Sequence, residues 1–300
     1  MTFGPDVRLY VATMAGEILS VDADGQSALY VDGFIVPAGI AFQPGTDKLF
    51  VSSRLVNESV GGEAQISVVE NGEISQLLDG FPCCYTSYHS ANGIAFGPDG
   101  YGYVSVGARA DHGEILDGSG RQDELHPWEA TILRFHPDGS EIEPFACGLR
   151  NAYDIAWGAD DKLWASENQP DFDPPEEVHL VVPGGEHGYP WYECDVCFAA
   201  PEDVELVPPI ATFLPSVSPT GITVYLGEAF PGYFDTAFVT LWSAFEGAQK
   251  LSHITPDGQG PHDFAMGFAA PIEVVMGPDE ALYVADWATG IIFRIAYVGE

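Results

Sequence analysis

The feature that most constrains this chain is a repeated pair of short apolar segments joined by a tight turn. A clear copy spans residues 93–107, with apolar runs at 93–96 and 101–106 and the turn Gly-Pro-Asp-Gly at 97–100. Proline presets φ, aspartate hydrogen-bonds its own backbone, and glycine accepts a positive φ. The pattern therefore predicts a β-hairpin.

The same unit recurs along the whole chain, which decides the fold class. Six copies can be read, at residues 2–13, 39–53, 93–107, 154–167, 221–242 and 274–286. Further strand-like runs follow them, for example at 16–25, 64–74, 130–145 and 290–298. Four strands per copy, at a spacing of about 40–60 residues, are typical of propeller blades. We predict an all-β, six-bladed β-propeller with four-stranded blades around a central channel.

Length and hydropathy favour one domain over residues 1–300. Three hundred residues give about 50 per blade, and 46% of them are hydrophobic. Because the first copy begins at Thr2, we expect either that residues before it were trimmed or that the C-terminal strands seal the ring. The sequence has no apolar run of membrane-spanning length and no signal segment after Met1. We expect no membrane span and a periplasmic or extracellular location, with any leader removed.

The charge balance is strongly acidic, with 45 acidic and 10 basic residues and a formal net charge of −35. Binding to nucleic acid depends on lysine and arginine neutralising phosphates, so we exclude nucleic acid as a partner. The acidic residues predict a solvated surface suited to high salt or to an extracellular setting. Attraction of calcium is the alternative for some of them.

Five cysteines are too few for a disulfide scaffold and odd in number. Cys194 and Cys197 form a lone CxxC, for which a zinc site is one interpretation. In an oxidising compartment we expect a local disulfide, or a cross-link from the adjacent Cys83 and Cys84 to that loop. Cys147 is then expected to be a buried free thiol.

Polar residues stand directly before two of the inner strands. His89 precedes the apolar run of the third copy, where a histidine can act as a general base or can be a hydrogen-bonded structural residue. Arg150 and Asn151 hold the same position before the fourth copy, and a planar guanidinium beside an amide suits a carboxylate or a quinone oxygen. The long segment 108–130, between strands of the third copy, is expected to be a solvated loop.

An acidic turn follows the fourth hairpin. Glu167, Asp171 and Glu177 alternate there with proline and with exposed backbone carbonyls. Calcium takes six to eight oxygen ligands in flexible geometry, so this turn is a candidate calcium site. A solvated acidic loop is the alternative.

Taken in order, these motifs resemble the glucose/sorbosone dehydrogenase family. The resemblance covers nearly the whole chain and is closest to the sorbosone dehydrogenase-like branch. It implies soluble six-bladed propeller enzymes that use pyrroloquinoline quinone (PQQ) with calcium. The motifs are His89 with Asn92 to Gly100, Gly148 to Asn151, the turn at 167–171, Glu176 to His179, Gly188 to Pro190, Pro219 to Ile222, and the segments 237–251 and 271–295.

The resemblance implies a PQQ- and calcium-dependent dehydrogenase. It would oxidise an aldose sugar or a related alcohol or aldehyde by hydride transfer to the quinone, and would pass the electrons to an external acceptor. His89 matches the general base. The residues implied for the cofactor are Arg150, Asn151, Asn92, Lys250 and Trp242, and those implied for calcium are Gln169, Pro170, Asp171 and Glu177.

Two other functions stay open. The chain has Ala270 and Pro271 where family members carry an arginine, which suits a propeller that has lost the cofactor and serves as a binding module. A metal-dependent lactonase or other hydrolase would need carboxylate and amide ligands around a central metal. The loose candidates for those ligands are Glu17, Asn92, Asn151 and Asp286.

Overall fold

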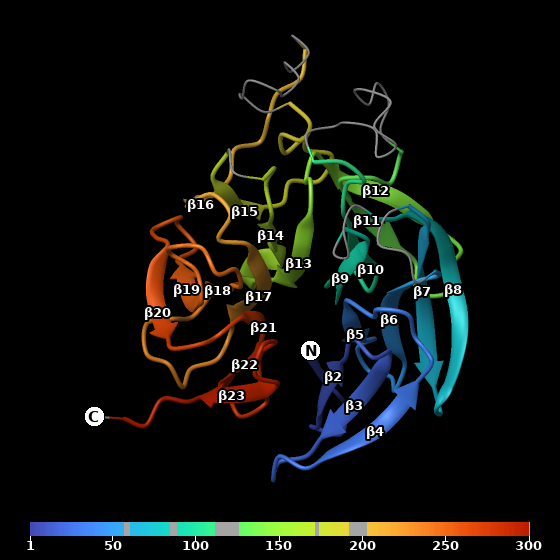
Figure 1. Cartoon of the computed structure of the whole chain (residues 1–300), viewed down its shortest axis with the longest axis vertical. Coiled ribbons are helices and arrows are strands. Elements are labelled where there is room, and N and C mark those ends of the chain that lie inside the picture. Colours follow the sequence, from blue (N-terminus) through green and yellow to red (C-terminus); the bar gives the residue numbers. More distant parts are fainter. Residues whose placement is uncertain (57–60, 85–88, 112–125, 172–173, 192–202, 300) are drawn as a thin grey trace. The chain divides into compact units, whose positions relative to one another are not determined.

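The computed structural model describes residues 1–299 apart from 57–60, 85–88, 112–125, 172–173 and 192–202 (Figure 1). Its regular elements are 23 β-strands and one 3-10 helix, η1 (Ala159–Asp161). Within these described residues, no helix combines the length and the apolar character needed to cross a membrane.

The predicted turn chemistry closes the hairpins. In the turn at 97–100, the Gly97 amide donates to the Tyr101 carbonyl and the Gly100 amide donates to the Gly97 carbonyl, at 2.8 and 2.9 Å. The Asp99 carboxylate accepts from the Tyr101 amide and from the Tyr103 hydroxyl. The same set of bonds surrounds Asp6 and Asp279. The repeat is therefore one local structure used several times.

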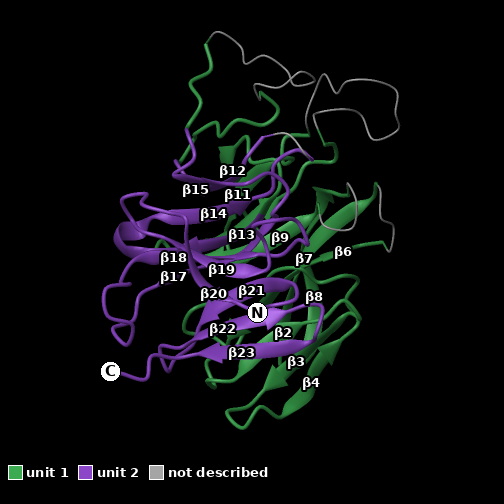
Figure 2. Ribbon diagram, turned by 60° about the vertical axis from the view of Figure 1, so that its left-hand side comes forward, with its two compact units in different colours: residues 1–152, 183–207 green, residues 153–182, 208–300 purple. Residues whose placement is uncertain are grey.

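The chain forms two compact units, coloured green and purple in Figure 2. The first comprises Met1–Ala152 and Pro183–Val207. It holds three antiparallel sheets, each with four strands in sequence order. Their strands are β1 (Thr2–Phe3), β2 (Leu9–Ala12), β3 (Glu17–Val21), β4 (Ser27–Asp32); β5 (Ile40–Phe42), β6 (Leu49–Arg54), β7 (Glu63–Glu70), β8 (Glu73–Pro82); and β9 (Ala91–Phe96), β10 (Gly102–Val106), β11 (Thr131–Phe135), β12 (Ile142–Cys147).

The second unit comprises Tyr153–Val182 and Pro208–Glu300. It too holds three antiparallel sheets, two with four strands and the last with three. Their strands are β13 (Ala152–Trp157), β14 (Leu163–Glu167), β15 (Glu176–Leu180), β16 (Ala211–Phe213); β17 (Pro219–Tyr225), β18 (Thr236–Leu241), β19 (Lys250–Ile254), β20 (His262–Met266); and β21 (Pro271–Met276), β22 (Leu282–Asp286), β23 (Ile291–Ile295).

Burial falls from the second strand of a sheet to the fourth. Every residue of β6, β10, β14 and β18 is buried, whereas β4 and β20 are mostly exposed. The apolar clusters lie between successive sheets within each unit, for example around Phe50 and Phe135, and around Trp164 and Val239. A strand packed on both faces favours apolar residues at successive positions, as at 49–51 of β6 and 163–165 of β14, and the polar residues that end these two strands are buried as well.

The fold is a six-bladed β-propeller, as the repeats predict. The six predicted hairpins are the first two strands of the six sheets. The last blade differs from the expected four strands, because within the described residues only β23 follows its hairpin. The prediction that residues 1–300 form one domain stays a prediction.

The fourth residue of the turn adopts a left-handed backbone conformation, which allows a test of the hairpin. Gly100 has φ +81° and a Cβ there would meet nothing within 4 Å, whereas Val7 occupies the equivalent position with φ 60°. Gly100→Val should lower the free energy of unfolding by about 1–2 kcal/mol through backbone strain alone. Urea unfolding measures the change.

The reverse substitution, Val7→Gly, is the matched control for this prediction. It removes the strain of a β-branched residue and adds about 0.5–1 kcal/mol of chain entropy cost. The free energy of unfolding should stay level or rise. A clear loss with Val7→Gly, or none with Gly100→Val, would contradict the account of the turn.

Candidate active site

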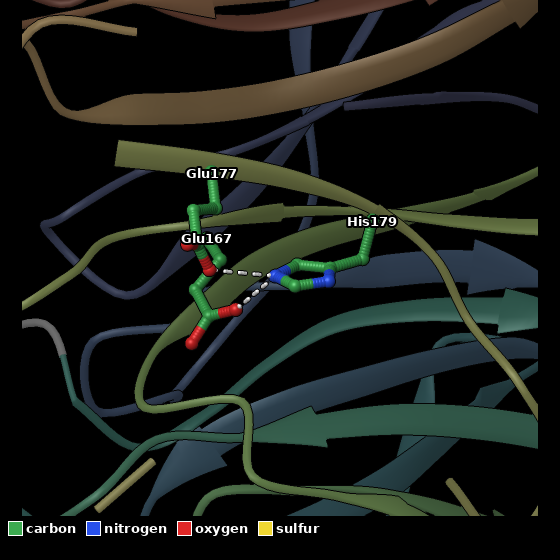
Figure 3. Close-up of side chains that lie close together, drawn as sticks. All are labelled: Glu167, Glu177 and His179. Atoms are coloured by element: carbon green, nitrogen blue, oxygen red, sulfur yellow. Dashed lines mark hydrogen bonds and ion pairs between the residues drawn. The ribbon is translucent and has the colours of Figure 1, made fainter. Parts of the chain in front are cut away.

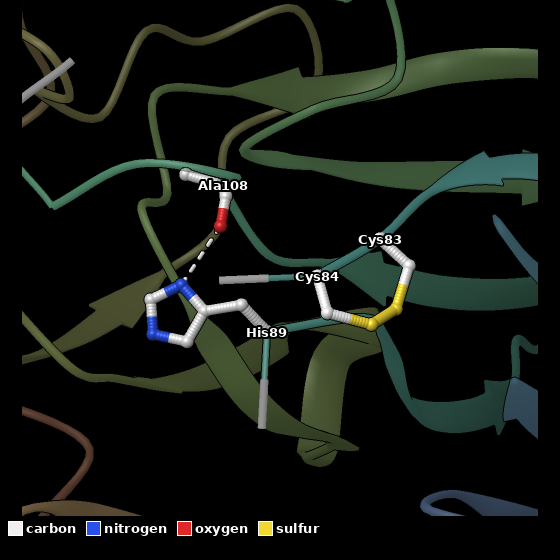
Figure 4. Close-up of a disulfide and its surroundings, with 4 residues drawn as sticks. All are labelled: Cys83, Cys84, His89 and Ala108. Carbon is white, nitrogen blue, oxygen red and sulfur yellow. Dashed lines mark hydrogen bonds between the residues drawn. A yellow bond between two sulfur atoms is a disulfide. The ribbon is translucent and has the colours of Figure 1, made fainter. Parts of the chain in front are cut away.

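His89 lies two residues before β9, at the end of a hairpin, as the sequence predicts. The Gly107 amide donates to the Ser90 carbonyl at 2.9 Å, so the chain leaving β10 runs beside the chain entering β9. His89 Nδ1 lies 2.8 Å from the Ala108 carbonyl oxygen (Figure 4). A carbonyl can only accept, so Nδ1 carries the proton and Nε2 carries the lone pair of the neutral ring.

The surroundings of His89 keep its imidazole neutral. The residue is buried, with 6% of its surface exposed. Burial lowers the pKa of His89 well below its usual 6.5, and the positive charge of Arg150 lowers that pKa further. A neutral imidazole with a fixed tautomer at pH 7 is the form that accepts a proton.

Arg150 and Asn151 stand directly before β13, as predicted, and both are buried. The Arg150 guanidinium donates from Nε to the backbone carbonyl of Asp111 at 3.1 Å and from Nη2 to its carboxylate at 2.6 Å. The charge-assisted pair fixes the guanidinium. Sequence reasoning missed this role of Asp111, because the pair joins residues 39 positions apart.

Two asparagines lie against each other in the same unit. The Asn92 side-chain amide donates to Asn151 Oδ1 at 2.9 Å and to the Ala152 carbonyl at 3.3 Å. A Cβ on Gly107 would lie 2.5 Å from Asn151 Oδ1 and 3.0 Å from His89 Cα. The first unit therefore brings together one imidazole and two amides, and a guanidinium next to Asn151 in the chain.

The start of the long segment 108–130 is fixed by an ion pair between the partly exposed Arg109 and the buried Glu129. The Glu129 carboxylate is 2% exposed and accepts from the Arg109 backbone amide at 2.6 Å and from its guanidinium at 3.0 Å. Residues 112–125 lie outside the described residues, so the prediction of a solvated loop stays a prediction for them.

The predicted calcium turn lies directly after β14, in the second unit. Gln169 and Pro170 are buried and Asp171 is exposed. The Gln169 backbone amide donates to Glu176 at 2.8 Å, and its side-chain amide donates to Glu177 at 2.5 Å. Two neighbouring glutamates thus fix the backbone and the side chain of Gln169.

Glu167, Glu177 and His179 form a cluster beside this turn (Figure 3). His179 Nε2 lies 2.9 Å from Glu167 Oε2 and 3.0 Å from Glu177 Oε2. Burial alone would lower the pKa of His179, but its bonds to the two carboxylates and their charges outweigh burial and raise that pKa to about 9. Sequence reasoning placed Glu167 and Glu177 in the candidate calcium turn but noted His179 only as part of a motif.

Other residues considered from the sequence have local partners in the second unit. Lys250 Nζ pairs with Asp263 at 2.6 Å, and the Trp242 ring packs edge-on against Trp287 at 6.0 Å. Asp286, a loose candidate for a hydrolase metal, accepts from the backbone amides of Ala269, Ala270 and Thr289. This carboxylate organises a loop.

The pairing of Cys83 and Cys84 differs from the expected cross-link between this pair and the loop of Cys194 and Cys197. Cys83 is joined to its neighbour Cys84, close to His89 in Figure 4. Cys147 is a free thiol, as expected, but is half-buried rather than buried. Cys194 and Cys197 lie outside the described residues, so their zinc or disulfide interpretation stays a prediction.

Comparison with known proteins identifies the family. The family model for glucose/sorbosone dehydrogenases matches residues 1–294. The chain belongs to this family. No curated protein matches the sequence. Membership in the glucose/sorbosone dehydrogenase family confirms the resemblance seen in the order of the sequence motifs.

Solved structures share the fold of this family member. A putative glucose dehydrogenase of Thermus thermophilus is 24% identical with a TM-score of 0.72, covering 94% of this chain and 88% of that one. The PQQ-bound aldose sugar dehydrogenase of Streptomyces coelicolor is 22% identical with a TM-score of 0.70, covering 94% and 86%. The calcium structure of a Trichoderma reesei family AA12 enzyme is 14% identical with a TM-score of 0.66, covering 98% and 91%. At these identities the likeness establishes the fold.

Gly107 gives a direct test of the packing at His89. Gly107→Ala would place a methyl group 2.5 Å from Asn151 Oδ1. We expect the added methyl group to push residue 107 and Asn151 apart. It should lower the free energy of unfolding by about 1–3 kcal/mol, as overpacking does. Urea unfolding checks this, and a variant as stable as the wild type would show that the contact is looser than described.

Proposed function

We propose that this protein is a PQQ- and calcium-dependent dehydrogenase that oxidises an aldose sugar or a related alcohol or aldehyde. The family membership supports the reaction class. The observation that carries the proposal is the hydrogen bond between His89 Nδ1 and the Ala108 carbonyl. It fixes the proton of a buried, neutral imidazole on Nδ1, so that Nε2 is the basic nitrogen that would accept a proton from a substrate hydroxyl.

The protein's part in this reaction is proton transfer and positioning. When bound, PQQ supplies a quinone that accepts the hydride, which is the chemistry the side chains lack. His89 takes the hydroxyl proton at Nε2, and the bond at Nδ1 stabilises the imidazolium that forms. A positioned base of this kind contributes about 10²–10⁴-fold to the rate.

The groups beside His89 suit an anionic, carbonyl-rich cofactor. Arg150 offers a buried cation, and Asn151 and Asn92 offer amide donors in the same unit. PQQ carries three carboxylates and two quinone oxygens, which need such donors in a chain of net charge −35. The assignment of Lys250 and Trp242 to the cofactor stays a prediction.

We assign calcium to the turn after β14. The carbonyls of Gln169 and Pro170, with the Asp171 and Glu177 carboxylates, form an all-oxygen donor set of the kind calcium takes. The bonds of Gln169 to Glu176 and Glu177 support a rigid turn. A calcium ion there would act as a Lewis acid.

The electrons must leave through an external acceptor, since no second redox group is proposed within the chain. We propose a periplasmic or extracellular location. The Cys83–Cys84 disulfide is consistent with it, because disulfides persist in oxidising compartments.

Replacement of the base tests the proposal. With PQQ and millimolar calcium, the wild type should bind the cofactor saturably and turn over aldoses with an electron-accepting dye. His89→Gln keeps a donor for the Ala108 carbonyl but has no base, so turnover should fall about 10²–10⁴-fold while PQQ affinity stays within a few-fold. Calorimetry and dye reduction measure the two quantities.

His136→Gln is the matched control, because His136 is 43% exposed and pairs with Asp138 on the surface. It should leave both quantities unchanged. Absence of PQQ binding by the wild type at about 100 μM would refute the dehydrogenase proposal and favour a binding module or a hydrolase. Full turnover by His89→Gln would refute the role of His89.

The lowered pKa of His89 sets the expected pH dependence. The neutral form is active, and its pKa lies well below 6.5 in the folded protein. As the pH falls from 8, kcat/KM should therefore hold through the usual histidine range and drop only below it. Initial rates across buffers from pH 8 to 5 measure the profile, and an acidic limb centred at 6.5 or above would contradict the burial effect.

A further inference from the structure

The sheet register places Glu167, Glu177 and His179 on one face. Glu167 of β14 is the direct cross-strand partner of Glu177 on β15. His179 follows Glu177 by two residues on the same strand. Since side chains alternate with a period of two, all three project from the same face of the sheet. Figure 3 shows them converging.

This arrangement concentrates negative charge in a buried place. The Glu167 and His179 side chains are fully buried, and the Glu177 side chain is 16% exposed. Like charges directly opposite each other on a sheet destabilise it, and a buried carboxylate needs a compensating charge. A positive imidazole supplies one charge for two carboxylates. A divalent cation would balance the negative charges of both carboxylates.

The donor set and its spacing suit a transition metal. Ligand atoms about 2.1 Å from a metal lie about 3.0 Å apart at adjacent corners of an octahedron and about 3.4 Å apart in a tetrahedron. The two N to O distances, 2.9 and 3.0 Å, lie close to the first value. One imidazole nitrogen with carboxylate oxygens is a set that zinc, iron and manganese take, whereas calcium prefers oxygen alone.

We propose that Glu167, Glu177 and His179 bind a divalent transition-metal ion, for which zinc serves as the probe. The Gln169 side-chain amide donates to Glu177 Oε2 at 2.5 Å and so orients that carboxylate, as hydrogen-bonding neighbours of metal ligands do. This site goes beyond the proposed dehydrogenase activity and does not need the quinone. It shares Glu177 with the donor set assigned to calcium, whereas Glu167 and His179 belong to this site alone. The competing account is an imidazole held between two carboxylates by hydrogen bonds only.

Metal binding to the full chain, without added PQQ, tests the proposal. The purified, tag-free protein is stripped with EDTA, titrated with zinc by calorimetry, and scanned for its unfolding temperature by circular dichroism. We expect binding near one ion per chain at this site and a higher unfolding temperature with zinc. If the stripped wild type neither binds zinc nor gains thermal stability, the hydrogen-bonded account holds and the proposal fails, whatever the variants do.

Variants assign the site. His179→Asn and Glu167→Gln should each weaken zinc binding at least about 100-fold, because loss of a ligand exceeds the effect of losing a group that only supports a ligand. His136→Asn, at a surface histidine, is the matched control and should bind as the wild type does. Circular dichroism verifies that each variant is folded.

Cobalt distinguishes this site from the CxxC at Cys194 and Cys197. Cobalt bound by imidazole and carboxylates should lack the near-ultraviolet thiolate charge-transfer band. Its visible spectrum should be lost in His179→Asn. A thiolate band, or zinc binding undiminished in both folded variants, would place the metal elsewhere and overturn the proposal.

Discussion

The hairpin at the start of each sheet is the constraint on which the candidate site depends. In an antiparallel hairpin, the residue before the first strand and the residue after the second lie at the same end. His89 and Ala108 hold these two positions around β9 and β10, and their bond fixes the imidazole. The Ala108 amide also donates to the Arg150 carbonyl at 2.6 Å, which ties this hairpin end to the residues that precede β13. The hairpin of β9 and β10 thus determines the surroundings of the His89 imidazole.

Several buried charges among the described residues are compensated at short range. Arg150 pairs with Asp111, Glu129 pairs with Arg109, and His179 lies between Glu167 and Glu177. With only 10 lysines and arginines against 45 acidic residues, each buried cation has a strong effect on its neighbours. An isolated buried ion is costly, so these pairs are needed for the segments that carry them to stay in place.

The sequence predicted the features that depend on local chemistry. The Pro-Asp-Gly turn gave the hairpins, and position relative to an apolar run put His89 and Arg150 before β9 and β13. The sequence did not predict features that are formed by two segments far apart in the chain. Asp111 is 39 residues from Arg150, and the pairing of Glu167 with Glu177 depends on a register that only the folded sheet sets. The bond between the adjacent Cys83 and Cys84 was also not predicted, because cysteine spacing alone does not determine disulfide connectivity.

The charge of Arg150 beside His89 serves two requirements of a strongly acidic enzyme that uses a quinone cofactor. Such an enzyme must hold an anionic cofactor, and it must keep its base unprotonated although the protein's net charge favours protonation. A buried guanidinium meets both demands at once, because its charge attracts carboxylates and lowers the pKa of the nearby imidazole. Asp111 fixes this guanidinium, accepting from Nε at its backbone carbonyl and from Nη2 at its carboxylate. Burial and the charge of Arg150 act together to lower the pKa of His89, which keeps the imidazole neutral.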